Sequence, residues 1–461
     1  MAGSKYYGQF GGQYVSESLM NTLAELEKAF DEAIRDPEFA KDYIYYLQEY
    51  VGRATPLYYA ERISEKYGAD IIIIETMVDI YEAKAAILAA KENSSLPVIC
   101  TVTFQEDKRM LTGTSILGAV TILESLGVDA LGVNCSLGPK ELIPIVDELL
   151  QYSKTPVIVQ PNAGLPKMIG GNTVFDLSAE EYSSIMEDFA HKGISIIGGC
   201  CGTDERFIKS IHDKLIDFSP VPRKIKPRSI IATATKCVDL DEGIKVIGER
   251  INPTGKKKLK EALINNNMEY ILREAVTQKE KGADILDVNV GLPEINESEV
   301  ITDDVKAIQS IIDLPLQIDS SDAEAIEAAL RIYNGKAIIN SVNGKTEIMD
   351  TIFKIARKYG ACVVGLTLDE NGIPSSAEER FKIAEKIVNT AEKYGIPKEN
   401  LLIDCLVLTA SAQQKEVSET LKAITMVREK LGVKTVLGVS NVSFGLPDRA
   451  LLNRTFLTMA L

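Results

Sequence analysis

Three cysteines in the first half of the chain have the residue type and the positions to bind a metal ion. Cys200 and Cys201 are adjacent in the stretch SIIGGCCGTDE, and Cys135 stands in GVNCSLG. A disulfide between the two neighbours is disfavoured, because consecutive Cα atoms lie about 3.8 Å apart, below the usual disulfide range. For the pair alone, two interpretations stay open: small buried residues at a strand end, or thiolate ligands.

The elements expected around these cysteines favour the metal. Short β-branched runs alternate with stretches of helical period, a pattern typical of βα units and a parallel sheet. Five strands are expected here, at residues 69–76, 97–104, 129–136, 155–162 and 194–201. Cys135 and the pair follow two of these strands, whose carboxyl ends open onto one face of a barrel. Three thiolates with a fourth position open are typical of a reactive zinc, on which a substrate thiol loses its proton.

A second series of strands is expected after residue 244. Its segments lie at residues 245–250, 283–289, 315–320, 336–342, 361–368, 401–407 and 435–441. The expected fold class is therefore α/β, with two (β/α)8 TIM-type barrels, the first lacking about three strands and the second its last strand. A helix-rich segment precedes them. The expected domains are residues 1–67, a partial barrel at 68–217, a proline-containing linker at 218–244, and the second barrel at 245–461.

Polar residues gather where the strands of the second series end, in DVNVG, QIDSS, INSVNG and VSNVSFGLPDR. Rows of Asp and Asn at one rim suit a flat heterocycle with many donors and acceptors, because carboxylates and amides satisfy both kinds of edge. The alternative is that these residues cap the helices that follow, which Asp, Asn and Ser do routinely.

Composition excludes several other classes of function. A net charge of −15, with no basic stripe, makes nucleic acid an unexpected partner. The start of the chain lacks a basic and apolar leader, and its apolar runs are strand-sized, so no membrane and a cytoplasmic location are expected. The sequence contains two histidines, His191 and His212, so chemistry built on histidine is not expected.

The motifs GVNCSLGP, PVIVQPNAGLP and IIGGCCGT resemble the zinc- and homocysteine-binding domain of cobalamin-dependent methionine synthases and related homocysteine S-methyltransferases. The resemblance covers about residues 68 to 216. It implies that Cys135, Cys200 and Cys201 bind zinc. It also implies that Glu75, in IIIIETM, pairs with the amino group of homocysteine.

The strand ends of the second series resemble the pterin-binding methyltransferase domain, the methyltetrahydrofolate module of the same enzymes. The resemblance implies that the pterin is lined by Asp287, Asn289, Asp319, Asn340 and Asp404, with Glu249 a looser candidate. Asn441 would be the catalytic residue, hydrogen-bonded near the pterin nitrogen that carries the methyl group.

Together these resemblances imply a methyltransferase that moves a methyl group from methyltetrahydrofolate through a corrinoid to zinc-bound homocysteine. Corrinoid modules carry a DxHxxG motif, and neither histidine of this chain lies in one. A corrinoid protein or a cobalamin module in another domain or chain would therefore be a partner. An alternative is a methyltetrahydrofolate–corrinoid methyltransferase only.

A third resemblance concerns the first 67 residues. The stretches YYGQFGGQYVSESLM and GRATPLYYAERISEKYGA resemble the N-terminus of the tryptophan synthase β chain, a pyridoxal-phosphate family. The lysine and the glycine-rich phosphate loop of that family do not follow. We therefore hypothesise a chain joined from two incomplete proteins, with an inactive fragment or a tryptophan synthase β fragment as further alternatives.

Overall fold

The computed structural model describes residues 6–7, 10–11, 20–49, 68–169 and 172–461. Contacts divide the chain into two compact units, Met1–Ala69 and Asp70–Leu461. The first unit contains the paired strands β1 (Tyr6–Tyr7) and β2 (Phe10–Gly11) and the helices α1 (Met20–Ala33) and α2 (Pro37–Glu49). Most residues of the two stretches that resemble tryptophan synthase lie outside the described residues.

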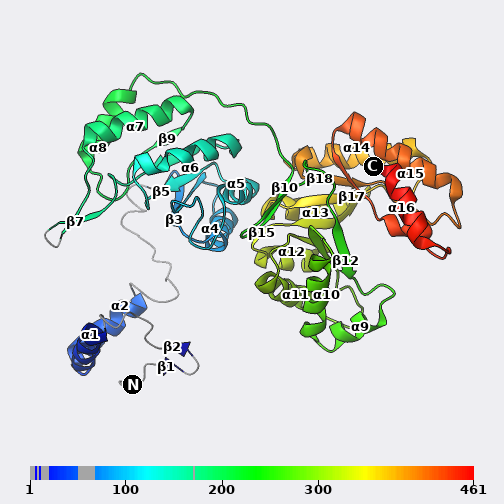
Figure 1. The fold of residues 1–461 in the computed structure, drawn as a ribbon, viewed down its shortest axis with the longest axis horizontal. Coiled ribbons are helices and arrows are strands. Elements are labelled where there is room, and N and C mark those ends of the chain that lie inside the picture. The colour runs from blue at the N-terminus through cyan, green and yellow to red at the C-terminus, as the bar shows by residue number, and fades with distance from the viewer. Residues whose placement is uncertain (1–5, 8–9, 12–19, 50–67, 170–171) are drawn as a thin grey trace. The chain divides into compact units, whose positions relative to one another are not determined.

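The second unit begins with a sheet of five parallel strands, and each segment expected in this part of the chain forms one. In sheet order they are β3 (Ile72–Met77), β4 (Val98–Val102), β5 (Ala130–Asn134), β6 (Val157–Gln160) and β9 (Ile196–Ile197). Their helices are α4 (Ile80–Asn93), α5 (Ile116–Ser125), α6 (Pro139–Tyr152), α7 (Ala179–Lys192) and α8 (Glu205–Leu215). A hairpin of β7 (Lys167–Ile169) and β8 (Asn172–Val174) precedes α7 (Figure 1).

This first sheet is a half-barrel. The central strands β4 and β5 are buried along their whole length, as expected for parallel strands covered on both faces. Ile71 and Ile73, at the outer strand β3, are 49% and 52% exposed, because no described strand pairs with the far side of β3. The prediction of five strands is confirmed, and a closed barrel is not formed by the described residues.

The second sheet has seven parallel strands. In order they are β12 (Ile247–Ile251), β13 (Ile285–Val288), β14 (Leu316–Asp319), β16 (Ile338–Asn343), β17 (Cys362–Leu366), β18 (Leu401–Asp404) and β19 (Lys434–Val436). The described strands β12 and β19 do not pair, so this sheet is open as well. Every segment expected in the second series is present as a strand.

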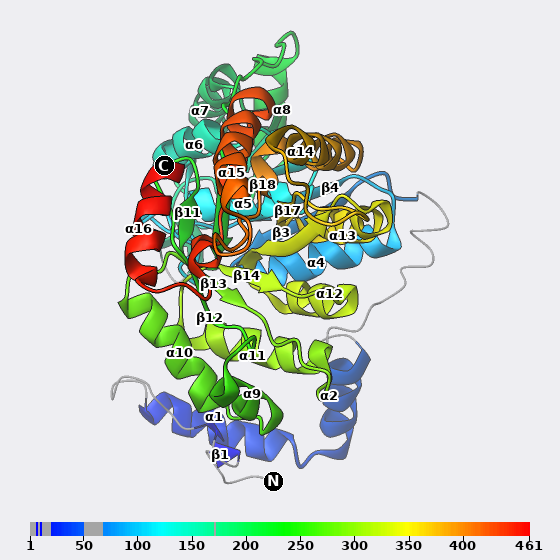
Figure 2. The ribbon, with the colours of Figure 1, turned by 90° about the vertical axis from the view of Figure 1, so that its right-hand side faces the viewer.

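Helices follow one another around the outside of the second sheet (Figures 1 and 2). They are α9 (Lys257–Ile264), α10 (Met268–Glu280), α11 (Glu297–Ile311), α12 (Ala323–Ile332), α13 (Thr346–Tyr359), α14 (Ala377–Lys393), α15 (Gln414–Met426) and α16 (Arg449–Ala460). Three short helices complete the series: the 3₁₀-helices η2 (Lys398–Asn400) and η4 (Val439–Ser443), and the π-helix η3 (Val427–Leu431). No helix among the described residues is long and apolar enough to cross a membrane.

The stretch at 218–244, expected to be a linker, contains a hairpin that the sequence did not reveal. Its strands are β10 (Ile230–Thr233) and β11 (Cys237–Asp239), and β10 also pairs with β15 (Gly335–Lys336). Helix α5 of the half-barrel packs against β10 and β15. This part of the expected linker is therefore built into the packing between the two β/α arrays.

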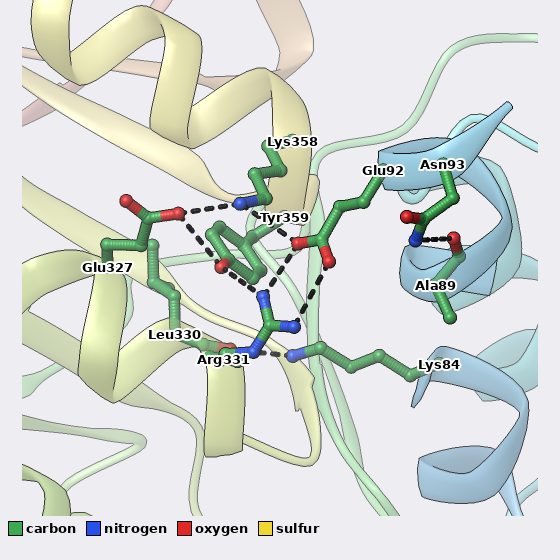
Figure 3. Close-up of polar contacts among 9 residues, drawn as sticks. All are labelled: Lys84, Ala89, Glu92, Asn93, Glu327, Leu330, Arg331, Lys358 and Tyr359. Carbon is green, nitrogen blue, oxygen red and sulfur yellow. Dashed lines mark hydrogen bonds and ion pairs between the residues drawn. The ribbon is translucent and has the colours of Figure 1, made fainter. Parts of the chain in front are cut away.

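A polar cluster joins the half-barrel to the second array (Figure 3). Lys84 of α4 is 2% exposed, and its Nζ donates to the carbonyl oxygens of Leu330 at 2.7 Å and Tyr333 at 2.6 Å, at the end of α12. Next to it, Glu92 accepts two hydrogen bonds from the Arg331 guanidinium, at 2.7 and 3.1 Å. Lysine at a helix C-terminus satisfies carbonyls that the helix itself leaves unpaired.

Lys84→Met is expected to destabilise the protein by about 2 kcal/mol at pH 8.5, because two buried carbonyl groups lose their donor. Unfolding in urea measures the change. Lys91→Met, on the exposed side of the same helix, is the matched control and should cost no more than about 0.5 kcal/mol. Equal effects of the two substitutions would contradict the assigned role of Lys84.

The cost of Lys84→Met should also grow with pH. Burial, and then the charge of Arg331, lower the pKa of Lys84 to about 7 from an ordinary value of 10.5. Between these values the unfolded chain binds the proton more tightly than the folded chain, so deprotonation stabilises the fold as pH rises. The destabilisation by Lys84→Met is therefore expected to be roughly 2 kcal/mol larger at pH 8.5 than at pH 6.5. A constant difference would exclude this titration.

Candidate functional site

The structure brings Cys135, Cys200 and Cys201 together at the carboxyl ends of β5 and β9. Their three Sγ atoms all lie within 4.8 Å of one another, and Sγ of Cys135 is 3.7 Å from Sγ of Cys201. A disulfide needs about 2.05 Å, so the thiols are free. Two sulfurs on a tetrahedral zinc, each about 2.3 Å from the ion, are about 3.8 Å apart. The spacing and the all-sulfur donor set fit zinc.

Local backbone conformations aim these thiols at one point. Cys135 has φ 59° and Ser136 has φ 61°, in the left-handed region that side chains seldom adopt. Gly202 has φ 82°, and a Cβ there would lie 2.4 Å from the Phe175 ring. Such strained residues cluster where the surrounding fold fixes a functional geometry.

Neighbouring strand ends are tied together beneath the cysteines. The buried Tyr182 hydroxyl donates to the carbonyl oxygens of Pro161 and Gly198, at 3.0 Å each, and so joins the ends of β6 and β9. The N–H of Cys200 donates to Pro161 O at 2.8 Å, and the N–H of Cys201 donates to Asn162 Oδ1 at 3.2 Å. The pair of cysteines is therefore held by its own backbone.

Without a cation, the three thiols hinder one another's ionisation. Burial and the neighbouring Cys135 raise the pKa of Cys200, and the hydrogen bond with Cys135 and then burial raise the pKa of Cys201 to about 11. A divalent cation reverses this balance, because it stabilises the thiolate form of each ligand. Cys135 and Cys200 are half-buried and Cys201 is exposed, so the group opens to solvent on one side.

Glu75 lies at the carboxyl end of β3, on the same side of the sheet as the cysteines, and its side chain is exposed. The next residue, Thr76, has φ 63° and donates its N–H to Asn134 Oδ1 at 2.8 Å. Asn134 precedes Cys135 in the chain. The strand end that carries Glu75 is thus tied directly to the strand end that carries a cysteine.

In the second sheet, four of the six residues expected to line a heterocycle form one group: Asp287, Asn289, Asp319 and Asn340. The register pairs Asp287 with Gln317 and Asp319 with Asn340 across neighbouring strands. Asp287 Oδ1 accepts from Gln317 Nε2 at 2.6 Å and from Asn340 Nδ2 at 3.5 Å. Asn289 also lies near Asp319, and its amide partly offsets the effect of burial on the pKa of that carboxyl.

The carboxyl groups of Asp287 and Asp319 resist ionisation in this group. Burial, and then the charge of Asp319, raise the pKa of Asp287, and burial also raises the pKa of Asp319. At least one of the two neighbouring carboxyls therefore keeps its proton near neutral pH, so the pair presents both a donor and an acceptor. Oδ2 of Asp287 and Oε1 of Gln317 are buried without a hydrogen-bond partner among the described residues, which is what a site for a polar ligand requires.

Asp404 and Asn441 stand apart from that group. Asp404 ends β18, and β17 lies between β18 and the strand of Asn340. Its Oδ1 accepts from Leu406 N–H at 2.7 Å, and burial raises its pKa to about 6. Asn441 lies in η4, after β19, with an exposed side chain. Both residues are on the carboxyl side of the sheet, but the structure does not bring them into contact with Asp287.

Several residues of these sites were missed from the sequence. Gln317 precedes Asp319 by two positions, so strand alternation could have placed both on one face. Arg380 of α14 is fully buried and donates to the carbonyl oxygens of Cys405 and Leu406, at 3.0 and 2.8 Å, beside Asp404. No local signal separates such an arginine from a surface residue of an amphipathic helix.

Two family models match this chain. Residues 14–215 match the family model of homocysteine S-methyltransferase, and residues 248–461 match that of pterin binding enzymes. The two matches lie one after the other along the chain, and neither covers half of it. The first match begins at residue 14, inside the segment that resembles tryptophan synthase, and that resemblance stays a prediction.

Two curated relatives of this pair of domains are methionine synthases. The chain is 32% identical to methionine synthase of Mycobacterium tuberculosis over 415 residues, and 32% identical to that of Mycobacterium leprae over 420 residues. Each match covers 85% of this chain and 34% of the relative, so the chain spans about a third of the length of these relatives.

Solved structures of dihydropteroate synthase are also similar to part of the chain. One, from Xanthomonas albilineans in complex with 7,8-dihydropteroate, has 20% sequence identity and a TM-score of 0.36. The similarity covers 50% of this chain and 88% of that one. Another, from Thermus thermophilus, has 17% identity and a TM-score of 0.36, and covers 50% and 89%.

Proposed function

We propose that this chain is a methyltransferase of the methionine synthase type, which uses methyltetrahydrofolate as methyl donor and homocysteine as acceptor, with a corrinoid supplied by another domain or chain. The observation that carries this proposal is the convergence of three thiols on one point in a domain that matches homocysteine S-methyltransferases. The match to methionine synthases supports the pairing with a folate domain.

In this proposal Cys135, Cys200 and Cys201 hold zinc. Bound zinc supplies Lewis acidity, which lowers the pKa of a thiol that takes the fourth position. The exposed side of the cysteine group admits that thiol, and Glu75, at the neighbouring strand end, pairs with the ammonium group of homocysteine. Orientation by two contacts holds the sulfur toward the incoming methyl group.

The carboxyl ends of the second sheet bind the pterin. The proton that the pair Asp287 and Asp319 keeps, with the amides of Asn289 and Asn340, matches a ring edge that carries both donors and acceptors. Asp404 and Asn441 complete the rim from the far strands. Asn441 hydrogen-bonds near the nitrogen that releases the methyl group and accommodates its protonated form. This matters because a tertiary amine leaves only with positive character on nitrogen.

Free cobalamin allows the two half-reactions to be measured separately by its absorbance. We expect the chain, loaded with zinc, to methylate reduced cobalamin from methyltetrahydrofolate and to demethylate methylcobalamin with homocysteine. The open half-barrel favours a second candidate, a methyltetrahydrofolate–corrinoid methyltransferase only, which would show the first half-reaction without the second. Absence of both would contradict either function, and absorbance of pyridoxal phosphate would favour a tryptophan synthase relative.

A further inference from the structure

Asn134 lies directly beneath the cysteine group, at the end of β5, and is 1% exposed. Its Oδ1 accepts from the Thr76 N–H at 2.8 Å and from the Thr101 hydroxyl at 2.7 Å. Its Nδ2 donates to Thr76 Oγ1 at 2.7 Å and to Cys200 Sγ at 3.8 Å. All the hydrogen-bonding capacity of the amide is therefore used, in contacts with three different strand ends.

These contacts fix which end of the amide faces the cysteine. The backbone N–H of Thr76 can only donate, so the oxygen of Asn134 must face Thr76. The two amide hydrogens then point to the Thr76 hydroxyl and to the sulfur of Cys200. The buried amide of Asn134 thereby presents a hydrogen-bond donor to the sulfur of Cys200, which carries negative charge when it binds a metal.

We propose that Asn134 is a positioning residue that sets the charge and the place of the Cys200 sulfur and holds the end of β3 that carries Glu75. This inference rests on the proposed zinc site and names a residue that supports it. Hydrogen bonds to ligand atoms orient them and strengthen metal binding. A donor to an anionic acceptor is also stronger than a bond between neutral groups.

The conformation of Thr76 shows how Asn134 can support both the end of β3 and the cysteine group. At φ 63° a β-branched side chain is in an unfavourable conformation, which persists only where the surroundings enforce it. Asn134 is bonded to both the N–H and the hydroxyl of Thr76, and Glu75 is the preceding residue. A change at Asn134 is therefore expected to weaken both the binding of zinc and the binding of the amino group of homocysteine.

Asn134→Asp provides the test, because aspartate can keep both accepted bonds while it replaces the donor to Cys200 by a negative oxygen. We expect zinc affinity, measured by competition with a chromophoric chelator, to fall by about 10- to 100-fold. With Co²⁺ in place of zinc, the sulfur-to-cobalt charge-transfer band should move to longer wavelength, since a sulfur without its hydrogen bond is the better electron donor. A merely structural role would not shift this band.

Asn93→Asp adds the same charge on the exposed surface of α4 and should leave both readouts unchanged. Asn134→Ser, which is smaller and neutral, keeps the test decisive if the aspartate variant does not fold. Wild-type affinity and an unshifted band in a folded Asn134 variant would overturn the positioning role. Failure of the wild-type chain to bind zinc would instead overturn the proposed function.

Discussion

Cys200→Ser is expected to weaken zinc binding by at least about 100-fold, because one of three thiolates is replaced by a hydroxyl that stays protonated at neutral pH. Metal content after gel filtration should fall from about one zinc per chain to a small fraction of that value. The loss should be accompanied by loss of homocysteine-dependent proton release, since the thiol of homocysteine then has no cation to ionise it. The same loss is expected for Cys135→Ser.

Cys237→Ser is the matched control for this prediction. Cys237 is a free, partly buried thiol of β11, outside the group formed by the other three. Its replacement changes the same atoms without touching the proposed ligands, so zinc content should be unchanged. One zinc per chain in Cys200→Ser, or equal loss in Cys237→Ser, would show that the metal, if bound, is held elsewhere.

Asp287→Asn should abolish most of the affinity for methyltetrahydrofolate while sparing the fold. Oδ1 can continue to accept from Gln317, but the unpartnered Oδ2 becomes an NH₂ group that presents donors where the ligand meets a carboxyl. A buried polar group left without its partner costs about 1–3 kcal/mol, so titration calorimetry should show binding weaker by roughly 10- to 100-fold.

Stability distinguishes this effect from simple damage. Asp287 is buried beside Asp319 with a raised pKa, so near neutral pH the folded chain keeps a proton that the unfolded chain releases, which costs stability. A neutral amide removes that cost. The thermal midpoint of Asp287→Asn is therefore expected to stay equal to, or exceed, that of the wild type. Asp303→Asn, on the exposed side of α11, should change neither quantity. Wild-type folate affinity in Asp287→Asn would remove this carboxyl from the site.

The sequence was most informative where the chemistry follows strand ends. Cys135 and Cys200 are far apart in the chain, yet they could be expected to meet, because parallel strands of one sheet open onto one side. Asp287, Asp319 and Asn340 follow the same logic on adjacent strands. Asp404 and Asn441 show its limit, since a common side of a sheet does not imply contact across intervening strands.

Contacts made by a single side chain between distant elements could not be read from the sequence. Lys84 lies in an ordinary alanine-rich helix, and its partners are the carbonyls of Leu330 and Tyr333 in another domain. Asn134 precedes a cysteine, but its role depends on Thr76 and Thr101 from neighbouring strands. The hairpin at 230–239 was hidden because its strands are short and follow several prolines.

Transfer of a labelled methyl group follows the whole proposed reaction in one experiment. The zinc-loaded chain would be incubated with trideuteromethyl-tetrahydrofolate, homocysteine, cobalamin and a reductant, and the products examined by mass spectrometry. We predict trideuterated methionine that depends on added cobalamin, is absent with Cys200→Ser, and is strongly reduced with Asp287→Asn when methyltetrahydrofolate is below saturation. If a wild-type chain that binds both zinc and methyltetrahydrofolate leaves the homocysteine unconverted, the proposed methyl transfer is wrong.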